Sequence, residues 1–353
     1  MKMHSIQNSL LSCFIFALMV TLFLVIQAQS CTSVCLVRDN HVIFGNNLDW
    51  FVEDGIIYIN KSNVKKRGLW FVNPAEWVSK YASITTNQEG REFPSRGMNE
   101  AGLVIGEMTL TVSEYPDRDD RAALNPLQWI QYQLDNCATV DEVVATDKNI
   151  RIEKGEYNSH FFVCDKNGDC ATIEWIDGKL KSHSKEHVPL KVLTNSPYAE
   201  CIENGNDSSG RFAKAAAMLD NYKSENPVDY VFSILDNVKQ KSTKWNLVFD
   251  AKNLKLYLRT AANRNIRYVS LRDFDLSCTA PVYILDINAK GKGNVFNKFV
   301  PYTQQANAKL VRSTFQKYES YFGPTPEVVI EKIITYPSTT QCLTNDKDQS
   351  ERL

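Results

Sequence analysis

The chain has 353 residues, of which 43% are hydrophobic and 23% charged, a composition typical of a globular protein with a large core. Its 40 basic and 41 acidic residues give a formal net charge of −1. The sequence therefore lacks the basic excess of nucleic-acid-binding proteins, and we expect no nucleic-acid partner.

The start of the chain differs in composition from the rest. Residues 10–26 are almost entirely apolar and follow a positively charged start, and Ala28 and Ser30 are small residues at −3 and −1 relative to Cys31. This is the pattern of a secretory signal peptide that is cleaved directly before the cysteine. We therefore expect residues 1–30 to be removed and the mature protein to be secreted or periplasmic.

Two alternatives exist for this leader. An uncleaved membrane anchor is one, because the apolar run is near the lower limit for spanning a bilayer. Lipoprotein processing also cuts before a cysteine, but Ala28 at −3 is not a larger aliphatic residue and Gln29 stands at −2. Since no later segment has eighteen consecutive apolar residues, we expect no membrane span after processing.

Residues 31–340 are predicted to form one domain, followed by a polar tail at 341–353. The beginning of this domain is rich in strand patterns, and Asp39-Asn40 between the first two apolar runs indicates a hairpin. The strands predicted in this part are Thr32–Arg38, Val42–Asn47, Gly55–Ile59, Tyr81–Thr86 and Leu103–Thr111.

Helix signals come next. Asn125 followed by Pro126 is typical of a helix N-terminus, and Thr139 with Glu142 forms a capping box for a second short helix. The later predicted elements are a hairpin of Phe161–Val163 and Ala171–Trp175, a strand at Leu190–Leu193, helices at Ser208–Tyr222 and Val228–Val238, and a hairpin of Trp245–Asp250 and Leu254–Arg259. Short turns join most strands, so the order favours an α+β fold with antiparallel sheets and helices outside them.

Eight cysteines remain after the predicted cleavage, in a compartment that permits disulfides. Cys164 and Cys170 flank a turn between two predicted strands, which makes them a possible disulfide pair. No C-x-x-C motif occurs and no histidine pair lies at ligand spacing beside cysteines, so we expect no metal site.

A cysteine at the new N-terminus has a particular chemistry. Its thiol, with an ordinary pKa of about 8.5, and its α-amine, with a pKa of about 7.7–8.0, share a proton near neutrality. The amine of Cys31 can therefore serve as the general base for its own thiol. No cofactor is required for such a nucleophile.

Several short motifs extend this interpretation. Cys31-Thr32-Ser33 is followed in order by Gly45–Asp49, Gly97–Leu103, Leu193–Pro197 and Ser209–Phe212. In these motifs the chain resembles the choloylglycine hydrolase family of linear amide C–N hydrolases. That family includes bile salt hydrolases and penicillin V acylases, and acid ceramidase is a relative. The resemblance spans about residues 31 to 285.

The resemblance implies an N-terminal nucleophile hydrolase fold, a four-layer αββα sandwich with antiparallel sheets. It implies that Cys31 attacks a linear N-acyl amide and forms a thioester acyl-enzyme, while Asp49 holds the α-amine. Asn195 would contribute to the oxyanion hole, and Arg211 would lower the pKa of the thiol. A small-molecule N-acyl amide is the expected partner, and the chain is expected to form a homo-oligomer.

Two positions depart from the family pattern. Asn46 stands where the family usually has arginine, and Thr109 stands where bile salt hydrolases have asparagine and penicillin V acylases have tyrosine. We count both as weaker candidates for the substrate and oxyanion site, and they argue against bile salts and penicillin V as the physiological substrates. Glu107, on the same predicted strand face as Thr109, is an additional acid without an assigned role.

Two other functions remain open from the sequence. An acid-ceramidase-like lipid amidase would expose its cysteine by internal autocleavage. A non-catalytic secreted binding protein would carry a lipidated Cys31 or a Cys31–Cys35 disulfide. In an enzyme the same disulfide would be a reversible off-switch.

Overall fold

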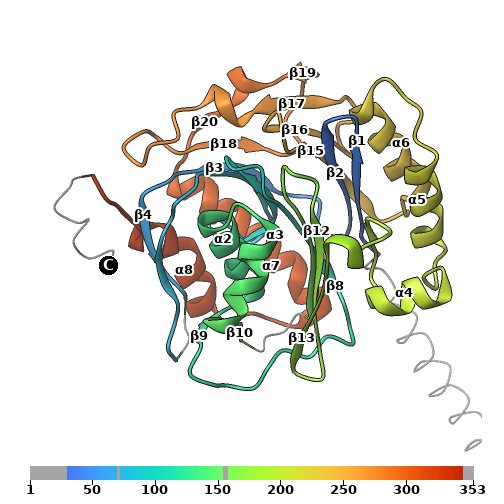
Figure 1. The fold of residues 1–353 in the computed structure, drawn as a ribbon. Helices are drawn as coiled ribbons and strands as arrows, with labels where there is room; N and C mark the ends of the chain where they lie inside the picture. The colour runs from blue at the N-terminus through green and yellow to red at the C-terminus, as the bar shows by residue number, and fades with distance from the viewer. Residues whose placement is uncertain (1–29, 70–71, 154–157, 345–353) are drawn as a thin grey trace, which may run out of the picture.

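The structure, a computed structural model, describes residues 30–69, 72–153 and 158–344 (Figure 1). The leader up to position 29, the aromatic pair Trp70-Phe71 and the tail from position 345 lie outside the described residues.

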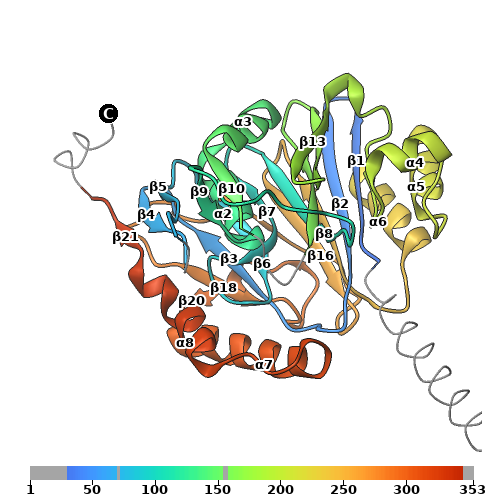
Figure 2. The ribbon, with the colours of Figure 1, turned by 90° about the horizontal axis from the view of Figure 1, so that it is seen from below.

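Two large, predominantly antiparallel sheets face each other at the centre of the molecule (Figure 2). In spatial order, the seven-stranded sheet consists of β14 (Val192–Leu193), β1 (Thr32–Arg38), β2 (His41–Asp49), β15 (Thr243–Asp250), β16 (Lys255–Thr260), β17 (Arg267–Ser270) and β19 (Gly293–Asn294). The nine-stranded sheet consists of β13 (Lys179–Ser184), β12 (Cys170–Ile176), β11 (Ser159–Cys164), β8 (Val104–Thr109), β7 (Pro94–Asn99), β6 (Ser83–Asn87), β3 (Ile56–Asn60), β18 (Tyr283–Asp286) and β20 (Val300–Pro301). Two small sheets pair β10 (Ile150–Ile152) with β9 (Ala122–Leu124), and join β21 (Gln341–Cys342), β4 (Val64–Arg67) and β5 (Glu76–Val78).

The predicted turn between the first two strands has the backbone that its residues favour. Asp39 and Asn40 both adopt positive φ, 47° and 66°, a conformation that Asn and Asp tolerate and that matches the twist of a tight hairpin. The turn fixes the β1–β2 register, in which Thr32 is paired with Asn47. Residue 31 therefore lies close to the end of β2.

Helices cover the outer face of each sheet. α5 (Arg211–Asp220) and α6 (Pro227–Val238) lie on the seven-stranded sheet, and α2 (Pro126–Asn136) and α3 (Val140–Ala145) lie on the nine-stranded sheet (Figure 2). α6 packs so closely on β2 that a Cβ at Gly45 would lie 2.4 Å from a Val231 methyl carbon. The fold is thus the expected four-layer αββα sandwich.

The core has two main parts. The larger lies between the sheets and beneath α5 and α6, where Phe44, Trp245 and Phe162 are fully buried. The second lies between the nine-stranded sheet and α2 and α3, around Trp129 and Trp175. Burying both faces of the sheets removes large apolar areas from water, which stabilises the layered arrangement.

The two predicted helix starts are confirmed. The Asn125 side chain accepts a hydrogen bond from the backbone N–H of Gln128 at 2.7 Å. Thr139 and Glu142 form the reciprocal capping box at the start of α3. These caps satisfy backbone donors that have no partner within the helix.

The Gly97–Leu103 motif has a structural role. Gly102 has a φ of 86° in the turn between β7 and β8, and a Cβ at Gly97 would lie 2.8 Å from Leu134 of α2. The Asn99 side chain donates hydrogen bonds to the carbonyls of Leu134 and Cys137 at the end of that helix. The motif therefore fastens α2 to the sheet.

The C-terminal part contains elements that the sequence patterns did not predict. Among them are α7 (Gln304–Phe322) and α8 (Glu327–Thr335), which pack together on the β3–β18 part of the nine-stranded sheet beside α2. The Tyr58 hydroxyl of β3 donates to Asn307 of α7 at 3.0 Å. The remaining helical elements are α4 (Tyr198–Asn204) and the 3₁₀ turns Thr146–Lys148, Lys185–His187, Leu271–Asp273, Phe296–Lys298 and Tyr336–Thr339.

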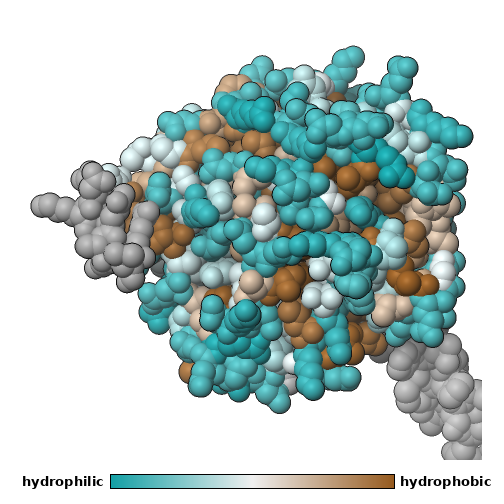
Figure 3. Space-filling model, viewed as in Figure 1, coloured by the Kyte–Doolittle hydropathy of each residue, from teal (hydrophilic) through white to brown (hydrophobic). Residues whose placement is uncertain are grey.

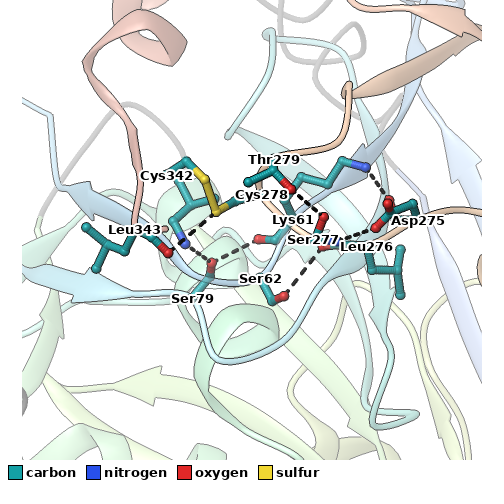
Figure 4. Close-up of a disulfide and its surroundings, with 11 residues drawn as sticks. Lys61, Ser62, Ser79, Asp275, Leu276, Ser277, Cys278, Thr279, Cys342 and Leu343 are labelled. Atoms are coloured by element: carbon teal, nitrogen blue, oxygen red, sulfur yellow. Dashed lines mark hydrogen bonds between the residues drawn. A yellow bond between two sulfur atoms is a disulfide. The ribbon is translucent and has the colours of Figure 1, made fainter. Parts of the chain in front are cut away.

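Two disulfides are present in the described chain. Cys164–Cys170 closes the β11–β12 hairpin as predicted, and Cys278–Cys342 was not predicted. The second disulfide joins the segment before β18 to β21, which pairs with β4 (Figure 4). Gln341 and Cys342, which the sequence analysis assigned to the polar tail, therefore belong to the folded domain.

Hydrophilic side chains predominate on the face drawn in Figure 3, and apolar residues form small patches between them. Within residues 30–69, 72–153 and 158–344, none of the helices has the length and apolarity required to cross a membrane.

The Cys278–Cys342 disulfide is expected to stabilise the whole domain. It closes a loop with a sequence separation of 64 residues, so Cys278→Ser should lower the free energy of unfolding by about 2–4 kcal/mol. Denaturant unfolding under non-reducing conditions measures this change. The Cys278→Ser/Cys342→Ser double variant should match the single variant, and unchanged midpoints in both would contradict the prediction.

Candidate active site

Cys31 lies immediately before β1, is 5% exposed, and lines a cavity of about 300 Å³. Burial raises the pKa of its thiol to about 11, and the Arg96 guanidinium opposes this increase. Arg96 Nη2 lies 3.8 Å from the sulfur, and the backbone N–H of Asp49 donates a hydrogen bond to it. The thiol is therefore protonated at neutral pH in the uncleaved chain, and a base is needed to activate it.

Asp49, the last residue of β2, is fully buried. Its Oδ1 accepts a hydrogen bond from the Thr243 hydroxyl. Oδ2 is also buried, and it has no hydrogen-bond partner among the residues that the structure describes. Burial raises the pKa of this carboxyl group to about 6, with the Thr243 hydrogen bond and nearby arginines opposing the increase. An unpartnered carboxylate oxygen beside the nucleophile is suited to receive a cation.

Arg211 holds the backbone around Cys31. It begins α5 after Gly210, whose φ is 75°, and its Nη1 donates to the Ser30 carbonyl at 2.6 Å and to the Cys31 carbonyl. The same nitrogen donates to Thr32 Oγ1 at 2.7 Å. The sequence analysis expected this arginine to act on the sulfur. The structure instead directs it to the main chain on both sides of the nucleophile.

The cation beside the sulfur is Arg96 of β7, which the sequence analysis missed. Its Nε donates to Asn46 Oδ1, Nη1 donates to Ser95 Oγ at 2.8 Å, and Nη2 donates to the Glu107 carbonyl at 3.2 Å. Asn46 is fixed in turn by a 2.8 Å hydrogen bond to Ser33 Oγ. The guanidinium thus crosses from the nine-stranded sheet to β2 in the other sheet.

The polar and apolar residues that line the cavity come mostly from different elements. Residues of β7, β8 and β11 supply most of its polar side, and most of its apolar side comes from the ends of β2 and α2 and from α7, α8 and their connection. The apolar residues are Leu48, Trp50, Phe93, Leu127, Phe315, Tyr318, Phe322, Val329 and Ile333. The C-terminal helices therefore form a wall of the same cavity that contains the thiol.

Comparisons with known proteins agree with this geometry. Residues 31–206 match the model of the linear amide C–N hydrolases, choloylglycine hydrolase family. Penicillin V acylase of Pectobacterium atrosepticum is 26% identical over 302 residues, which cover 67% of this chain and 79% of that protein. The chain belongs to the choloylglycine hydrolase family. It is accordingly an amidohydrolase that acts on non-peptide C–N bonds of linear amides.

Solved structures support the same assignment. The structure of penicillin V acylase from Agrobacterium tumefaciens superimposes with a TM-score of 0.69 at 28% identity, covering 77% of this chain and 98% of that one. A variant of conjugated bile acid hydrolase from Clostridium perfringens, at 20% identity, shares the fold with a TM-score of 0.61 and covers 75% of this chain and 99% of that one.

Thr109 and Asn195, both candidate residues from the sequence, lie together. The Asn195 side-chain amide, which follows β14, donates to the Thr109 carbonyl of β8 at 2.8 Å. Asn195 Oδ1 is buried without a hydrogen-bond partner in the described part of the chain. Thr109 is one of the residues that line the cavity, and Asn195 contacts the cavity wall through this hydrogen bond. The pair connects the two sheets at the edge of the site.

Cys31 and Cys35 are too far apart to form a disulfide. Four residues of extended chain span about 13 Å, whereas the Cα atoms of a disulfide are about 4.4–6.8 Å apart. Both thiols are free. The expectation of a Cys31–Cys35 pair, as a structural bond or as an off-switch, is therefore wrong.

Cys35 lies in a different environment. Its sulfur and those of Cys164 and Cys170 all lie within 4.8 Å of one another. Cys164 and Cys170 are joined as a disulfide, which leaves one free thiol in this cluster rather than a set of metal ligands. Burial raises the pKa of the Cys35 thiol to about 12, so it is an inert buried cysteine.

The Arg96 contact predicts a measurable change in the reactivity of Cys31. In Arg96→Met the cation beside the thiol is lost, so the pKa of Cys31 should rise by about one unit and its alkylation by iodoacetamide should slow about tenfold at fixed pH. Mass spectrometry of the Cys31 peptide follows the reaction. Arg96→Lys keeps the charge, so its alkylation rate should lie between those of wild type and Arg96→Met. Lys185→Met, which removes an exposed cation, is the control. Equal rates in Arg96→Met and wild type would contradict the prediction.

Proposed function

We propose that the protein is an exported hydrolase of linear N-acyl amides that uses Cys31 as an N-terminal nucleophile. The observation that carries the proposal is the unpartnered, buried Oδ2 of Asp49, on the residue whose backbone N–H contacts the Cys31 thiol. Cleavage of the Ser30–Cys31 bond creates an α-ammonium group at this place. A buried charge requires a partner of opposite charge, and here the Asp49 carboxylate and the new α-ammonium group pair with each other.

The α-amine is the base that this site offers. No described histidine lines the cavity, and His160, for example, is fully buried with its Nδ1 2.9 Å from Glu174. The neutral α-amine accepts the thiol proton, and the sulfur attacks the amide carbonyl carbon. The tetrahedral intermediate then expels the amine, which takes up the proton, and leaves a thioester on Cys31. Water activated by the same α-amine hydrolyses the thioester and restores the enzyme.

Other residues keep this arrangement in place. In the mature chain Arg211 keeps its hydrogen bonds to the Cys31 carbonyl and to Thr32 Oγ1, and Arg96 favours the thiolate by its charge. Asn195 Nδ2 donates one N–H to the Thr109 carbonyl, and its second N–H is the proposed side-chain donor to the oxyanion, together with backbone N–H groups. Because Asn46 replaces the usual family arginine, Arg96 supplies the positive charge from a different strand.

The acyl group is proposed to be apolar. The cavity volume of about 300 Å³ is at the lower end of the range for small-molecule sites, and aromatic and aliphatic side chains form one side of it. Burying an aliphatic or aromatic acyl group against this wall supplies binding energy of about 25 cal/mol per Å². The wall positions the scissile bond at Cys31.

The position of Cys31 after the leader supports export followed by cleavage at residue 30. A lipid amidase resembling acid ceramidase, with internal autocleavage, is the alternative within enzymes. The two differ in gel analysis, since cleavage after the leader leaves one chain of mature length and internal autocleavage leaves two fragments.

The role of Cys31 has a direct test. The exported protein should begin at Cys31 by intact mass, and Cys31→Ala should lose at least about 10³-fold in kcat/KM on an N-acyl amide because the attacking sulfur is removed. A form that retains Ser30 should also be inactive, since the backbone nitrogen of Cys31 is then part of an amide bond and cannot accept the thiol proton. Full activity of Cys31→Ala, or a mature chain that begins elsewhere, would overturn the proposal.

The apolar wall has a matched pair of variants. Val329 of α8 lines the cavity, whereas its neighbour Val328 is 62% exposed and does not. Val329→Trp should fill the acyl site and reduce kcat/KM for long acyl chains about tenfold or more relative to acetyl amides, since a misplaced substrate loses reactive geometry. Val328→Trp should leave this ratio unchanged. Equal effects of both variants across chain lengths would exclude this wall as the acyl site.

A further inference from the structure

The polar side of the cavity contains an acid that the mechanism does not use. Glu107 of β8 lines the cavity with Cys31, and its Oε1 accepts a hydrogen bond from Ser159 Oγ at 2.6 Å. The carboxylate is close enough to the nucleophile for its charge to act on the thiol, raising its pKa. Its side chain is only partly buried, so it also faces the space that a ligand occupies.

The positive charge in the cavity is committed to the protein. The charged residues that line the cavity are Glu89, Arg96 and Glu107, one cation and two anions. Arg96 is 1% exposed and directs its donors to Asn46, Ser95, the Glu107 carbonyl and the Cys31 sulfur. It is therefore not placed to bind an anionic group of a substrate.

The distribution of side chains indicates which half of the substrate Glu107 meets. The apolar wall of α2, α7 and α8 suits the acyl group, so the amine half is left with the polar side around Glu107, Thr109 and Ser159. Charges a few ångströms apart in a partly buried site interact by more than they do in water. A carboxylate there attracts an ammonium or a hydrogen-bond donor and repels another anion.

We propose that Glu107 selects the leaving amine: the enzyme favours N-acyl amides whose amine half is cationic or carries a hydrogen-bond donor, and it disfavours those that end in a carboxylate or sulfonate. The preferred substrate class is thus N-acyl diamines and N-acyl amino alcohols rather than N-acyl amino acids. The inference rests on the proposed function, since it assigns the amine subsite of the same cavity. Glu107 is a specificity-determining residue and is not required for the chemical step.

Three substrates that differ in the terminal group of the amine half test this proposal. N-octanoyl-ethylenediamine, N-octanoylethanolamine and N-octanoylglycine share the acyl group and a two-carbon amine, and they end in a cation, a neutral hydroxyl and an anion. The wild-type kcat/KM should fall in that order, with about tenfold or more between the cation and the anion. Glu107→Gln keeps the size and the acceptor for Ser159, and it should reduce this ratio about tenfold while changing the neutral substrate by less than about threefold.

Two further variants locate the effect. Glu186→Gln removes an exposed charge elsewhere, with a side chain 78% exposed, and should leave the ratio unchanged. Glu89→Gln removes the other acid of the cavity, which accepts a hydrogen bond from the Tyr318 hydroxyl of the apolar wall, and should change the ratio less than Glu107→Gln does. A larger effect of Glu89→Gln, or an equal loss on all three substrates in Glu107→Gln, would overturn the assignment to Glu107.

Equilibrium binding separates this inference from the proposed function. The same three amides can be titrated into the Cys31→Ala variant, with and without Glu107→Gln, by calorimetry. If the affinities fall from the cation to the anion and this order is lost in Glu107→Gln, the inference is supported even if the enzyme turns over none of the amides. Absence of turnover would count against the proposed function alone. Binding of N-octanoylglycine as tight as that of the diamine would refute the inference, whatever the activity of the enzyme.

Discussion

The guanidinium of Arg96 is the contact on which the arrangement of the site depends. It originates in the nine-stranded sheet, yet its hydrogen bonds reach Asn46 in the other sheet and the Cys31 sulfur. A buried arginine is stable only when nearly all of its donors have acceptors. The two sheets must therefore meet in one alignment, and this alignment also forms the cavity beside the nucleophile.

Local signals in the sequence were sufficient for much of the fold. The Asp39-Asn40 turn, the Asn125 cap, the Thr139–Glu142 box and the Cys164–Cys170 hairpin depend on neighbouring residues, and all four are present. Cys31 and Asp49 could be predicted to lie together because one hairpin joins their strands, with Thr32 opposite Asn47.

Contacts between distant segments were not predictable in this way. Arg96 lies in a strand whose sequence, Pro94–Asn99, lacks regular apolar alternation, because its glycine and polar residues serve close packing and hydrogen bonding. The Cys278–Cys342 pair joins segments 64 residues apart, and spacing alone does not indicate a partner at that distance. Arg211 contacts the backbone and Thr32 rather than the sulfur because of the direction its side chain takes, and a sequence motif does not indicate that direction.

The position of α7 and α8 separates two tasks in the chain. The nucleophile and its supporting groups come from β1, β2, β7 and the start of α5, whereas the apolar wall comes largely from residues after 300. The family model matches residues 31–206, so the part of the wall that α7 and α8 contribute lies outside the matched region. Substitutions in this C-terminal helix pair would therefore change the group that the cavity accepts without altering the strands that carry the nucleophile.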